Sequence, residues 1–177
     1  MRVRLILFGD ADRRLAQQIA RRVEEVLVPT ATVAPGSLPL PAEVYDPARG
    51  QYLVGALLNR VREAQAPAAD RVLGVADADL YAGDLNFVFG QAELPGRVAV
   101  MSLTRLRPEF WGGQPDEKLL LQRAAKEAVH ELGHTLGLRH CPNPNCVMHF
   151  SNRLADTDRK SVEPCPRCMA KIDRQLR

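Results

Sequence analysis

The chain has 177 residues, of which 46% are hydrophobic, and its formal net charge is +3 at pH 7. This length and apolar content predict a single domain with a substantial core rather than a disordered chain. The arginines alternate with acidic residues and form no polybasic tract, so nucleic-acid binding is not expected. No run of about 18 apolar residues is present, so the sequence predicts no membrane partner.

The N-terminus begins with positive charges and a short apolar run, as a signal peptide does. The run ends at Gly9 and Asp10, which is too short for a signal peptide, and no small-residue cleavage site follows. A buried first strand is the better interpretation. A cytoplasmic protein is therefore expected.

Apolar periodicity and turn residues predict alternating strands and helices. The predicted elements, in chain order, are a strand at 2–9, a helix at 11–28, an irregular segment or edge strand at 29–49, a helix at 50–66, strands at 71–76, 86–90 and 97–103, a helix at 116–136 and a last short helix at 167–176. After residue 137 the composition changes, and prolines are interleaved with cysteines. A loop-rich, metal-binding tail is expected there.

The most informative stretch covers 130–140 and reads His-Glu-Leu-Gly-His-Thr-Leu-Gly-Leu-Arg-His. On a helix with 3.6 residues per turn, His130 and His134 lie one turn apart on one face and can bind a single zinc ion. Gly137 can adopt the left-handed conformation that ends a helix, so the chain turns and brings in His140 as a third ligand. Three protein ligands leave one position open, which is typical of a catalytic zinc site.

Glu131 lies beside the histidine face, where it can contact a metal-bound water rather than the metal itself. Zinc lowers the pKa of its water toward neutrality and polarises the carbonyl of a substrate. Glu131 is predicted to take the water proton and pass it to the leaving amine, while the metal stabilises the oxyanion. The predicted reaction is hydrolysis of a peptide bond.

The alternative interpretation is a helix that merely carries surface histidines. A bare His-Glu-x-x-His pattern can arise by chance on any helix. Here, however, three of the four histidines fall within one eleven-residue window, together with a glycine at the helix end. This spacing favours a metal site.

All four cysteines, Cys141, Cys146, Cys165 and Cys168, follow residue 140. Two close pairs of thiolates are typical of a closed tetrahedral zinc site with a structural role, and the Cys-x-x-Cys pair is the stronger half of the pattern. A redox pair and buried free thiols are the alternatives. Because Cys141 directly follows His140, adjacent residues are expected to serve two metals, so losing the cysteine site should disturb His140.

The stretch HELGHTLGLRHC, followed by Cys146-Val147-Met148 and Cys165-x-x-Cys168, resembles the archaemetzincin family of metzincin-clan metallopeptidases. This signature covers 130–168, under a quarter of the chain. Metzincins carry a methionine turn beneath the catalytic zinc, so the resemblance implies that role for Met148. Without the resemblance, Met148 would be interpreted as an ordinary residue of the hydrophobic core. It also implies two zinc ions per chain, one catalytic and one structural.

The resemblance implies an α/β (or α+β), metzincin-like fold class. We expect a twisted, mostly parallel sheet with an edge strand above a cleft, backing helices, an active-site helix that binds zinc, and a small loop-rich C-terminal part with the four-cysteine site. A single metallopeptidase domain over 1–177 is expected, divided into 1–137 with the active-site helix and 138–177 with the methionine turn and cysteines. A monomer is the default oligomeric state.

Several weaker candidates lie outside the signature. Asp77, Asp79 and Asp84 either form a carboxylate or calcium site or are ordinary solvated and capping residues. The strand predicted at 86–90 contributes its two phenylalanines to the core or offers an edge to an extended peptide. Glu127, one turn before Glu131, either supports a zinc ligand or is an exposed helix glutamate, which is the more ordinary interpretation.

Three classes of function fit the sequence. The first is a zinc peptidase that acts on peptides or unfolded protein segments. The second is a non-enzymatic zinc-binding interaction module whose cysteine-rich tail docks a partner, and the third is a zinc hydrolase for another amide or ester. Glu131 favours an enzyme, because a pure metal site needs three ligands and no general base.

Overall fold

The computed structural model describes residues 1–64 and 69–176. Its helices and strands, in chain order, are β1 (Arg2–Phe8), α1 (Arg13–Val26), β2 (Thr30–Leu38), β3 (Tyr45–Asp46), β4 (Gln51–Leu53), α2 (Val54–Glu63), β5 (Arg71–Ala76), β6 (Leu80–Tyr81), β7 (Gly90–Ala92), β8 (Val98–Ser102), α3 (Glu117–Thr135), α4 (Leu154–Arg159) and α5 (Pro166–Leu176). In these two ranges no helix is both long enough and apolar enough to span a membrane.

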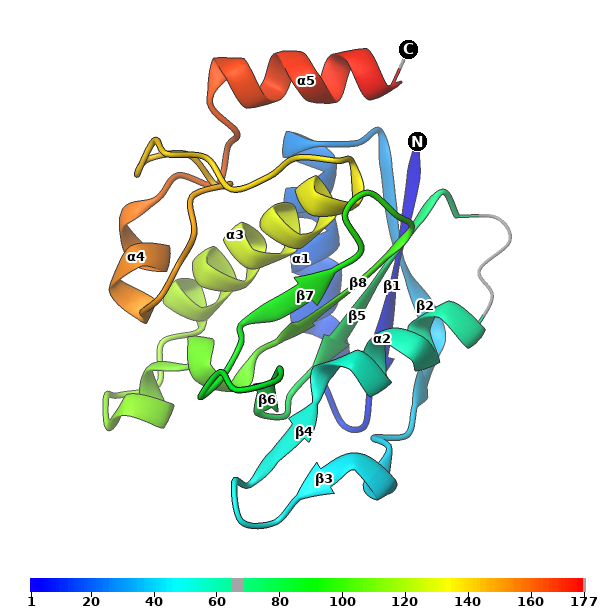
Figure 1. Ribbon diagram of the computed structural model, residues 1–177, viewed down its shortest axis with the longest axis vertical. Coiled ribbons are helices and arrows are strands. Elements are labelled where there is room, and N and C mark those ends of the chain that lie inside the picture. The colour runs from blue at the N-terminus through cyan, green and yellow to red at the C-terminus, as the bar shows by residue number, and fades with distance from the viewer. Residues whose placement is uncertain (65–68, 177) are drawn as a thin grey trace.

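Five strands form the main sheet, in the order β2-β1-β5-β8-β7 (Figure 1). The first four run parallel, and β7 runs antiparallel to β8 at one edge. A second, smaller sheet contains β3, β4 and β6. The mostly parallel main sheet with its edge strand confirms the predicted fold class.

Helices cover both faces of the main sheet, with α1 and α3 on one face and α2 on the other (Figure 1). Alternate residues of β1 therefore enter two different cores. Leu5 and Leu7 pack with α1 and α3, whereas Ile6 and Phe8 pack with α2. Successive side chains of a strand point to opposite faces, so a strand buried on both faces reads as one continuous apolar run.

The α3 helix carries the predicted histidines and is buried on more than one side toward its end. Asp116 caps its first turn, because the Asp116 side chain accepts a hydrogen bond from Leu119 N. One face of the helix packs on the sheet, and the tail after Gly137 covers another, so the residues from Ala128 to Gly133 are all buried. Polar side chains on this part of α3 are consequently held in a largely dry environment.

Most predicted elements are confirmed, and β5 matches its predicted range residue for residue. The helix predicted at 50–66 begins only at Val54, because Gln51–Leu53 pair with β3 and β6 as β4; its predicted end falls outside the described residues. The strand predicted at 86–90 is wrong. The edge strand begins only at Gly90. Before it, Val88 N–H donates to the Leu80 carbonyl oxygen of β6, and the Asn86 carbonyl oxygen accepts from the Gln51 side chain, so this segment forms no continuous ladder with β8.

The centre of β5 yields a test of this packing. A Cβ added to Gly74 would lie 2.7 Å from Val61 Cγ2 and 2.9 Å from Phe8 Cε2. We expect Gly74→Ala to lower the free energy of unfolding by about 1–3 kcal/mol through overpacking, as measured by chemical denaturation. The matched control is Gly55→Ala in α2, where a Cβ meets open space and should stabilise by about 0.4–1 kcal/mol. A Gly74→Ala variant as stable as the wild type would contradict this packing.

Candidate active site

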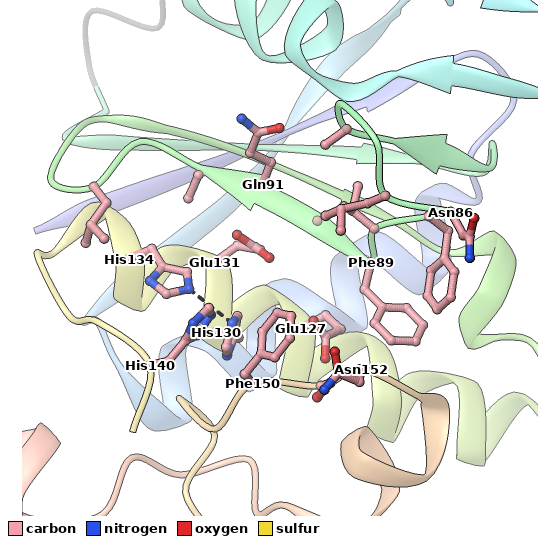
Figure 2. A pocket seen from close by; sticks show the side chains of 18 residues that line it. Asn86, Phe89, Gln91, Glu127, His130, Glu131, His134, His140, Phe150 and Asn152 are labelled. Carbon is pink, nitrogen blue, oxygen red and sulfur yellow. Dashed lines mark hydrogen bonds between the residues drawn. The ribbon is translucent and has the colours of Figure 1, made fainter. Parts of the chain in front are cut away.

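Two histidines one turn apart on α3 face a common cleft (Figure 2). His130 Nδ1 lies 2.8 Å from the Val147 carbonyl oxygen, and His134 Nδ1 lies 2.7 Å from that of Leu138. A carbonyl only accepts hydrogen bonds, so each Nδ1 must carry the proton and donate. The two Nε2 atoms, 3.1 Å apart, are therefore left with lone pairs directed into the same space.

The third histidine reaches this space because the chain reverses after α3. Gly137 adopts a left-handed conformation with φ of 81°, and its N–H donates to the His134 carbonyl oxygen at 2.8 Å. The His140 ring then lies 5.4 Å from that of His130 and 4.9 Å from that of His134, measured between centroids. One nitrogen from each of the three rings lies within 4.8 Å of the other two.

This arrangement fits a zinc ion. Two nitrogen lone pairs only 3.1 Å apart repel unless a cation lies between them. Tetrahedral zinc with Zn–N bonds of about 2.0–2.1 Å separates two nitrogens by about 3.3 Å, close to the observed spacing. Burial lowers the pKa of all three histidines, with the Lys160 charge as the next cause at His130. The rings are thus neutral near pH 7, the form that binds a metal.

Glu131 points into the same cleft from the position next to His130 (Figure 2). Its side chain is buried, and Oε2 has no hydrogen-bond partner in the described part of the chain. Gly90 of β7 leaves room for it, because a Cβ there would lie 2.6 Å from Glu131 Oε1. Burial, followed by the nearby Glu127 charge, raises the pKa of Glu131 well above its usual range. A carboxyl group in this state is suited to accepting and returning a proton.

Met148 is completely buried beneath α3. A Cβ added to Gly133 would lie only 2.5 Å from Met148 Sδ, so the glycine allows the methionine to pack this close to the helix. The preceding residue, Val147, supplies the carbonyl that orients His130. Met148 therefore lies where a methionine turn is expected, directly under the helix that carries the histidines.

The four cysteines form a second cluster, with their Sγ atoms within 4.8 Å of one another. All four thiols are free, and Sγ of Cys141 lies 3.9 Å from Sγ of Cys165. Tetrahedral zinc with Zn–S bonds of about 2.3 Å separates two sulfurs by about 3.8 Å, so the spacing fits. A backbone N–H bond from Cys168 is the main cause that lowers the pKa of Cys165 to about 7, which favours the thiolate that binds metal.

Backbone hydrogen bonds connect the two clusters. Cys141 N–H donates to the Met148 carbonyl oxygen at 2.8 Å, and His149 Nδ1 donates to the Cys141 carbonyl oxygen at 2.9 Å. His149 is half-buried and is not part of the group formed by the other three histidines. The segment that carries His140 is thereby held by the cysteine cluster and the methionine turn together.

A cleft of about 530 Å³ opens in front of the histidines (Figure 2). The edge strand β7 and the chain before it form one wall. Phe150 forms part of the opposite wall, and its ring centroid lies 4.7 Å from that of His140. The cleft therefore lies between β7, whose second edge pairs with no other strand in the described ranges, and the residues that follow Met148.

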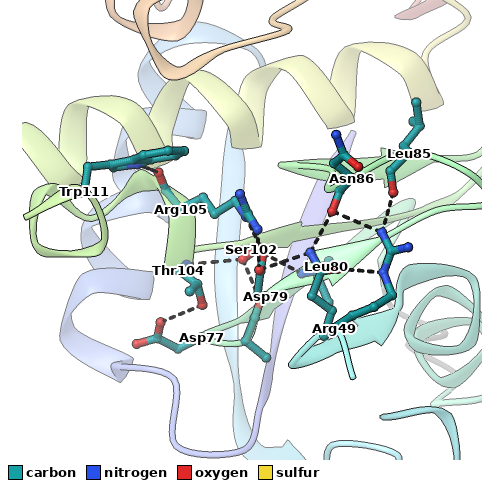
Figure 3. Close-up of polar contacts among 12 residues, drawn as sticks. Arg49, Asp77, Asp79, Leu80, Leu85, Asn86, Ser102, Thr104, Arg105 and Trp111 are labelled. Atoms are coloured by element: carbon teal, nitrogen blue, oxygen red, sulfur yellow. Dashed lines mark hydrogen bonds and ion pairs between the residues drawn. The ribbon is translucent and has the colours of Figure 1, made fainter. Parts of the chain in front are cut away.

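Asp77, after β5, and Asp79, before β6, are engaged in ion pairs, of which Figure 3 shows the one between Asp79 and Arg105. Asp79 makes a bidentate pair with Arg105, at 2.7 and 2.8 Å, and Asp77 pairs with Arg107. Asp84 is exposed. These three carboxylates do not form a metal-binding group among the described residues, so a calcium site is not supported.

The Asp79–Arg105 pair instead holds the rim of the cleft in place (Figure 3). Gln51 Nε2 donates to Asp79 Oδ2 at 3.1 Å and to the Asn86 carbonyl oxygen at 2.9 Å. The Arg105 guanidinium also stacks on the ring of Phe87, 4.3 Å from its centroid. The chain between β6 and β7 is thus fixed by charged and polar groups from distant segments.

Glu127, which reads as an exposed helix residue, is only 2% exposed. Its Oε1 accepts a hydrogen bond from Thr157 Oγ1 at 3.1 Å and lies 3.0 Å from Lys160 Nζ. The Lys160 side chain is fully buried. Both partners belong to α4 and the residue after it, a helix that the sequence analysis missed, and no local pattern distinguishes Lys160 from a surface lysine.

Comparisons with known proteins agree with this geometry. The profile of peptidase family M54 matches residues 7–174. An archaemetzincin of Pyrococcus furiosus is 51% identical over 147 residues, 80% of this chain and 75% of the relative. That of Methanocaldococcus jannaschii is 41% identical over 97% of this chain and 93% of the relative. The crystal structure of archaemetzincin from Methanopyrus kandleri matches with a TM-score of 0.86 and 43% identity, covering 99% of this chain and 95% of that one.

The rim of the cleft gives a second test. We expect Asp79→Ala to lower the free energy of unfolding by about 1.5–3 kcal/mol, because Arg105 loses its charged partner. The Val88 amide, which donates to the Leu80 carbonyl oxygen, should exchange with solvent at least about tenfold faster in an NMR measurement. The exposed Asp84→Ala is the control, with an expected change below about 0.5 kcal/mol. Unaltered exchange at Val88 would show that the rim does not depend on Asp79.

Proposed function

The chain belongs to peptidase family M54, and from this membership we propose that it hydrolyses peptide bonds at the centre formed by His130, Glu131, His134 and His140. The family establishes a zinc metallopeptidase that acts on peptides or proteins. The single observation that carries the placement is the buried Glu131 carboxyl beside three converging histidine nitrogens. A site that only binds metal needs no such carboxyl group.

We assign one zinc ion to each cluster of ligands. The catalytic zinc is held by His130, His134 and His140, and the structural zinc by Cys141, Cys146, Cys165 and Cys168. Bound zinc in the histidine site would polarise the substrate carbonyl and acidify the attacking water. The Nδ1 hydrogen bonds of His130 and His134 fix the direction of both rings and make their Nε2 atoms better ligands.

Glu131 is the proposed general base. Its Oε2 has no competing partner among the described residues, so it can accept a proton from the attacking water. The same oxygen then carries the proton to the leaving amine as the peptide bond breaks. Gly90 maintains the space for this carboxyl group, because any side chain at that position would displace it.

The substrate backbone is proposed to bind along β7. Among the described residues this strand pairs only with β8, which leaves its other edge to bond an extended peptide as an added strand. Backbone hydrogen bonds of this kind bind many sequences alike. Selectivity among substrates must then arise from the side chains that line the cleft.

Met148 is proposed as the methionine turn that supports the histidines from beneath, through its contact with Gly133. We also propose one metallopeptidase domain, divided into 1–137 and 138–177. Both parts contribute to one core, which includes Leu132 from the first part and Met148 and Ile172 from the second. This shared core favours one folding unit over two independent ones.

Other properties stay predictions from the sequence. A monomer in the cytoplasm is expected, with neither nucleic acid nor membrane as a partner. The interspersed charges support the expectation about nucleic acid. The apolar N-terminal run is the buried strand β1, with Leu5 and Leu7 in the core, which supports its interpretation as part of the fold.

The role of Glu131 is tested by Glu131→Gln, which keeps the side-chain shape and removes the base. We expect peptide turnover to fall by roughly 10²- to 10⁴-fold while zinc stays bound. Mass spectrometry of a diverse peptide library, incubated with each protein, measures the loss. Glu117→Gln, at the exposed start of the same helix, is the matched control and should cleave as the wild type does.

Two outcomes of this experiment would change the proposal. Cleavage by Glu131→Gln at the wild-type rate would remove Glu131 from the role of base. A wild-type protein that holds its zinc but cleaves no peptide would favour the alternative of a zinc-binding interaction module.

Metal content tests the assignment of two zinc ions. Mass spectrometry of the metals in purified protein should find about two zinc ions per chain, and about one in either His134→Ala or Cys168→Ser. Cys168→Ser should lower the melting temperature more than His134→Ala does, because a structural zinc contributes directly to folding. One zinc or fewer in carefully purified wild type would refute the two-site assignment.

A further inference from the structure

Glu127 lines the cleft but has no part in the proposed mechanism. It lies one helical turn from Glu131, and Figure 2 shows it on the side of the cleft where Phe150 and Asn152 lie. A buried carboxylate is strongly destabilising unless it is paired. The ion partner of Glu127 is Lys160, whose side chain is completely buried. Glu127 therefore lines the cleft as one half of a buried ion pair that has no net charge, and Lys160 lies behind it.

The two oxygens of this carboxylate differ in their contacts. Oε1 accepts the hydrogen bond from Thr157 and is also the oxygen that lies 3.0 Å from Lys160 Nζ. The hydrogen bond and the ion pair of this carboxylate with Thr157 and Lys160 are both made at Oε1, and Glu127 lines the cleft. The contacts at Oε1 fix the orientation of the carboxylate, and they leave Oε2 as an acceptor for a group that enters the cleft.

A second polar atom in the cleft also lacks a partner. Ser151 Oγ is buried, lines the cleft and makes no hydrogen bond to the described residues. Buried polar side chains in folded proteins nearly always have a hydrogen-bond partner. An unpaired hydroxyl and a half-satisfied carboxylate in one cavity therefore indicate that this cavity receives a polar group from a ligand.

Three aromatic rings also line the cleft, among aliphatic and amide side chains. Phe87 and Phe89 line it from the segment before β7, with their rings in an edge-to-face arrangement and centroids 5.1 Å apart. Phe150 lines it from the opposite side. An entering side chain would thus meet apolar rings along its body and polar atoms elsewhere.

We propose that this pocket selects substrates by a side chain with an aromatic body and an uncharged hydrogen-bond donor at its tip, which among the natural residues is best met by tyrosine. The inference rests on the proposed peptidase function and names the class of substrate for that site. Glu127 Oε2 accepts the hydrogen bond of the phenol, and Ser151 Oγ is the second polar partner available in the cleft.

The charges in the pocket argue against other side chains. A lysine or arginine would bring a second cation to a carboxylate that Lys160 already neutralises. The cost of removing that second charge from water would then not be offset by an unpaired negative charge. An acidic side chain would meet Glu127 before the fully buried Lys160 and would be repelled. Phenylalanine would fit the rings but leave Glu127 Oε2 and Ser151 Oγ unpaired.

The first experiment compares kcat/KM of the wild type for sets of peptides that differ only at one residue near the scissile bond. At one position, tyrosine should exceed phenylalanine by about 10- to 100-fold, and lysine and glutamate should be poorer than both. Equal rates for tyrosine and phenylalanine at every position, or a preference for lysine, would overturn the proposal.

Two variants assign the preference to these residues. Ser151→Ala removes one polar partner and should reduce the ratio of tyrosine to phenylalanine by several-fold, while the exposed Ser37→Ala should leave it unchanged. The double variant Glu127→Leu, Lys160→Met replaces the ion pair by apolar side chains, which folded proteins often tolerate, and should reverse the preference in favour of phenylalanine. A double variant that folds and still prefers tyrosine would refute the role of Glu127.

Binding to Glu131→Gln separates this proposal from the proposed function. Calorimetry with uncleaved peptides should show the same preference for tyrosine over phenylalanine. If the wild type cleaves peptides but neither protein discriminates between the two, the substrate class is wrong and the peptidase stands. If tyrosine peptides bind selectively but nothing is cleaved, the pocket is supported and the proposed reaction is wrong.

Discussion

The hydrogen bond between His130 Nδ1 and the Val147 carbonyl is the contact on which the site depends. It joins α3, which is held by the sheet, to the segment between α3 and α4, which forms neither a helix nor a strand. The same bond sets the ring tautomer and orientation of His130. Because Met148 directly follows Val147, the bond also places the methionine under Gly133 and, through the backbone contact of Met148 with Cys141, aligns the cysteine cluster.

The parts of the fold that depend on local patterns could be predicted from the sequence. The apolar run Val72-Leu73-Gly74-Val75-Ala76 lies between turn residues and reads as a strand buried on both faces, which β5 is. The histidines follow equally well, because helical periodicity places His130 and His134 on one face and Gly137 provides the turn to His140. These features need only neighbouring residues for their geometry.

The parts that depend on distant partners could not be predicted in this way. The residues before Gly90 alternate as a strand should, yet Gln51 and Leu80 bind their backbone and prevent a continuous ladder. Glu127 looks like a surface residue until α4 brings Lys160 against it. Gln51 lies 35 residues from Asn86, and Lys160 lies 33 residues from Glu127. Local periodicity carries no information about partners at such separations along the chain.

The order of the site's components along the chain has a consequence for biosynthesis. The sheet and α3, with Glu131, precede His140, Met148 and every cysteine. A ribosome releases the N-terminal segments first, and they begin to fold as they emerge. A nascent chain therefore carries Glu131 and two histidines before it has the third histidine or Met148. The proposed centre is complete only when the tail has been translated and folded.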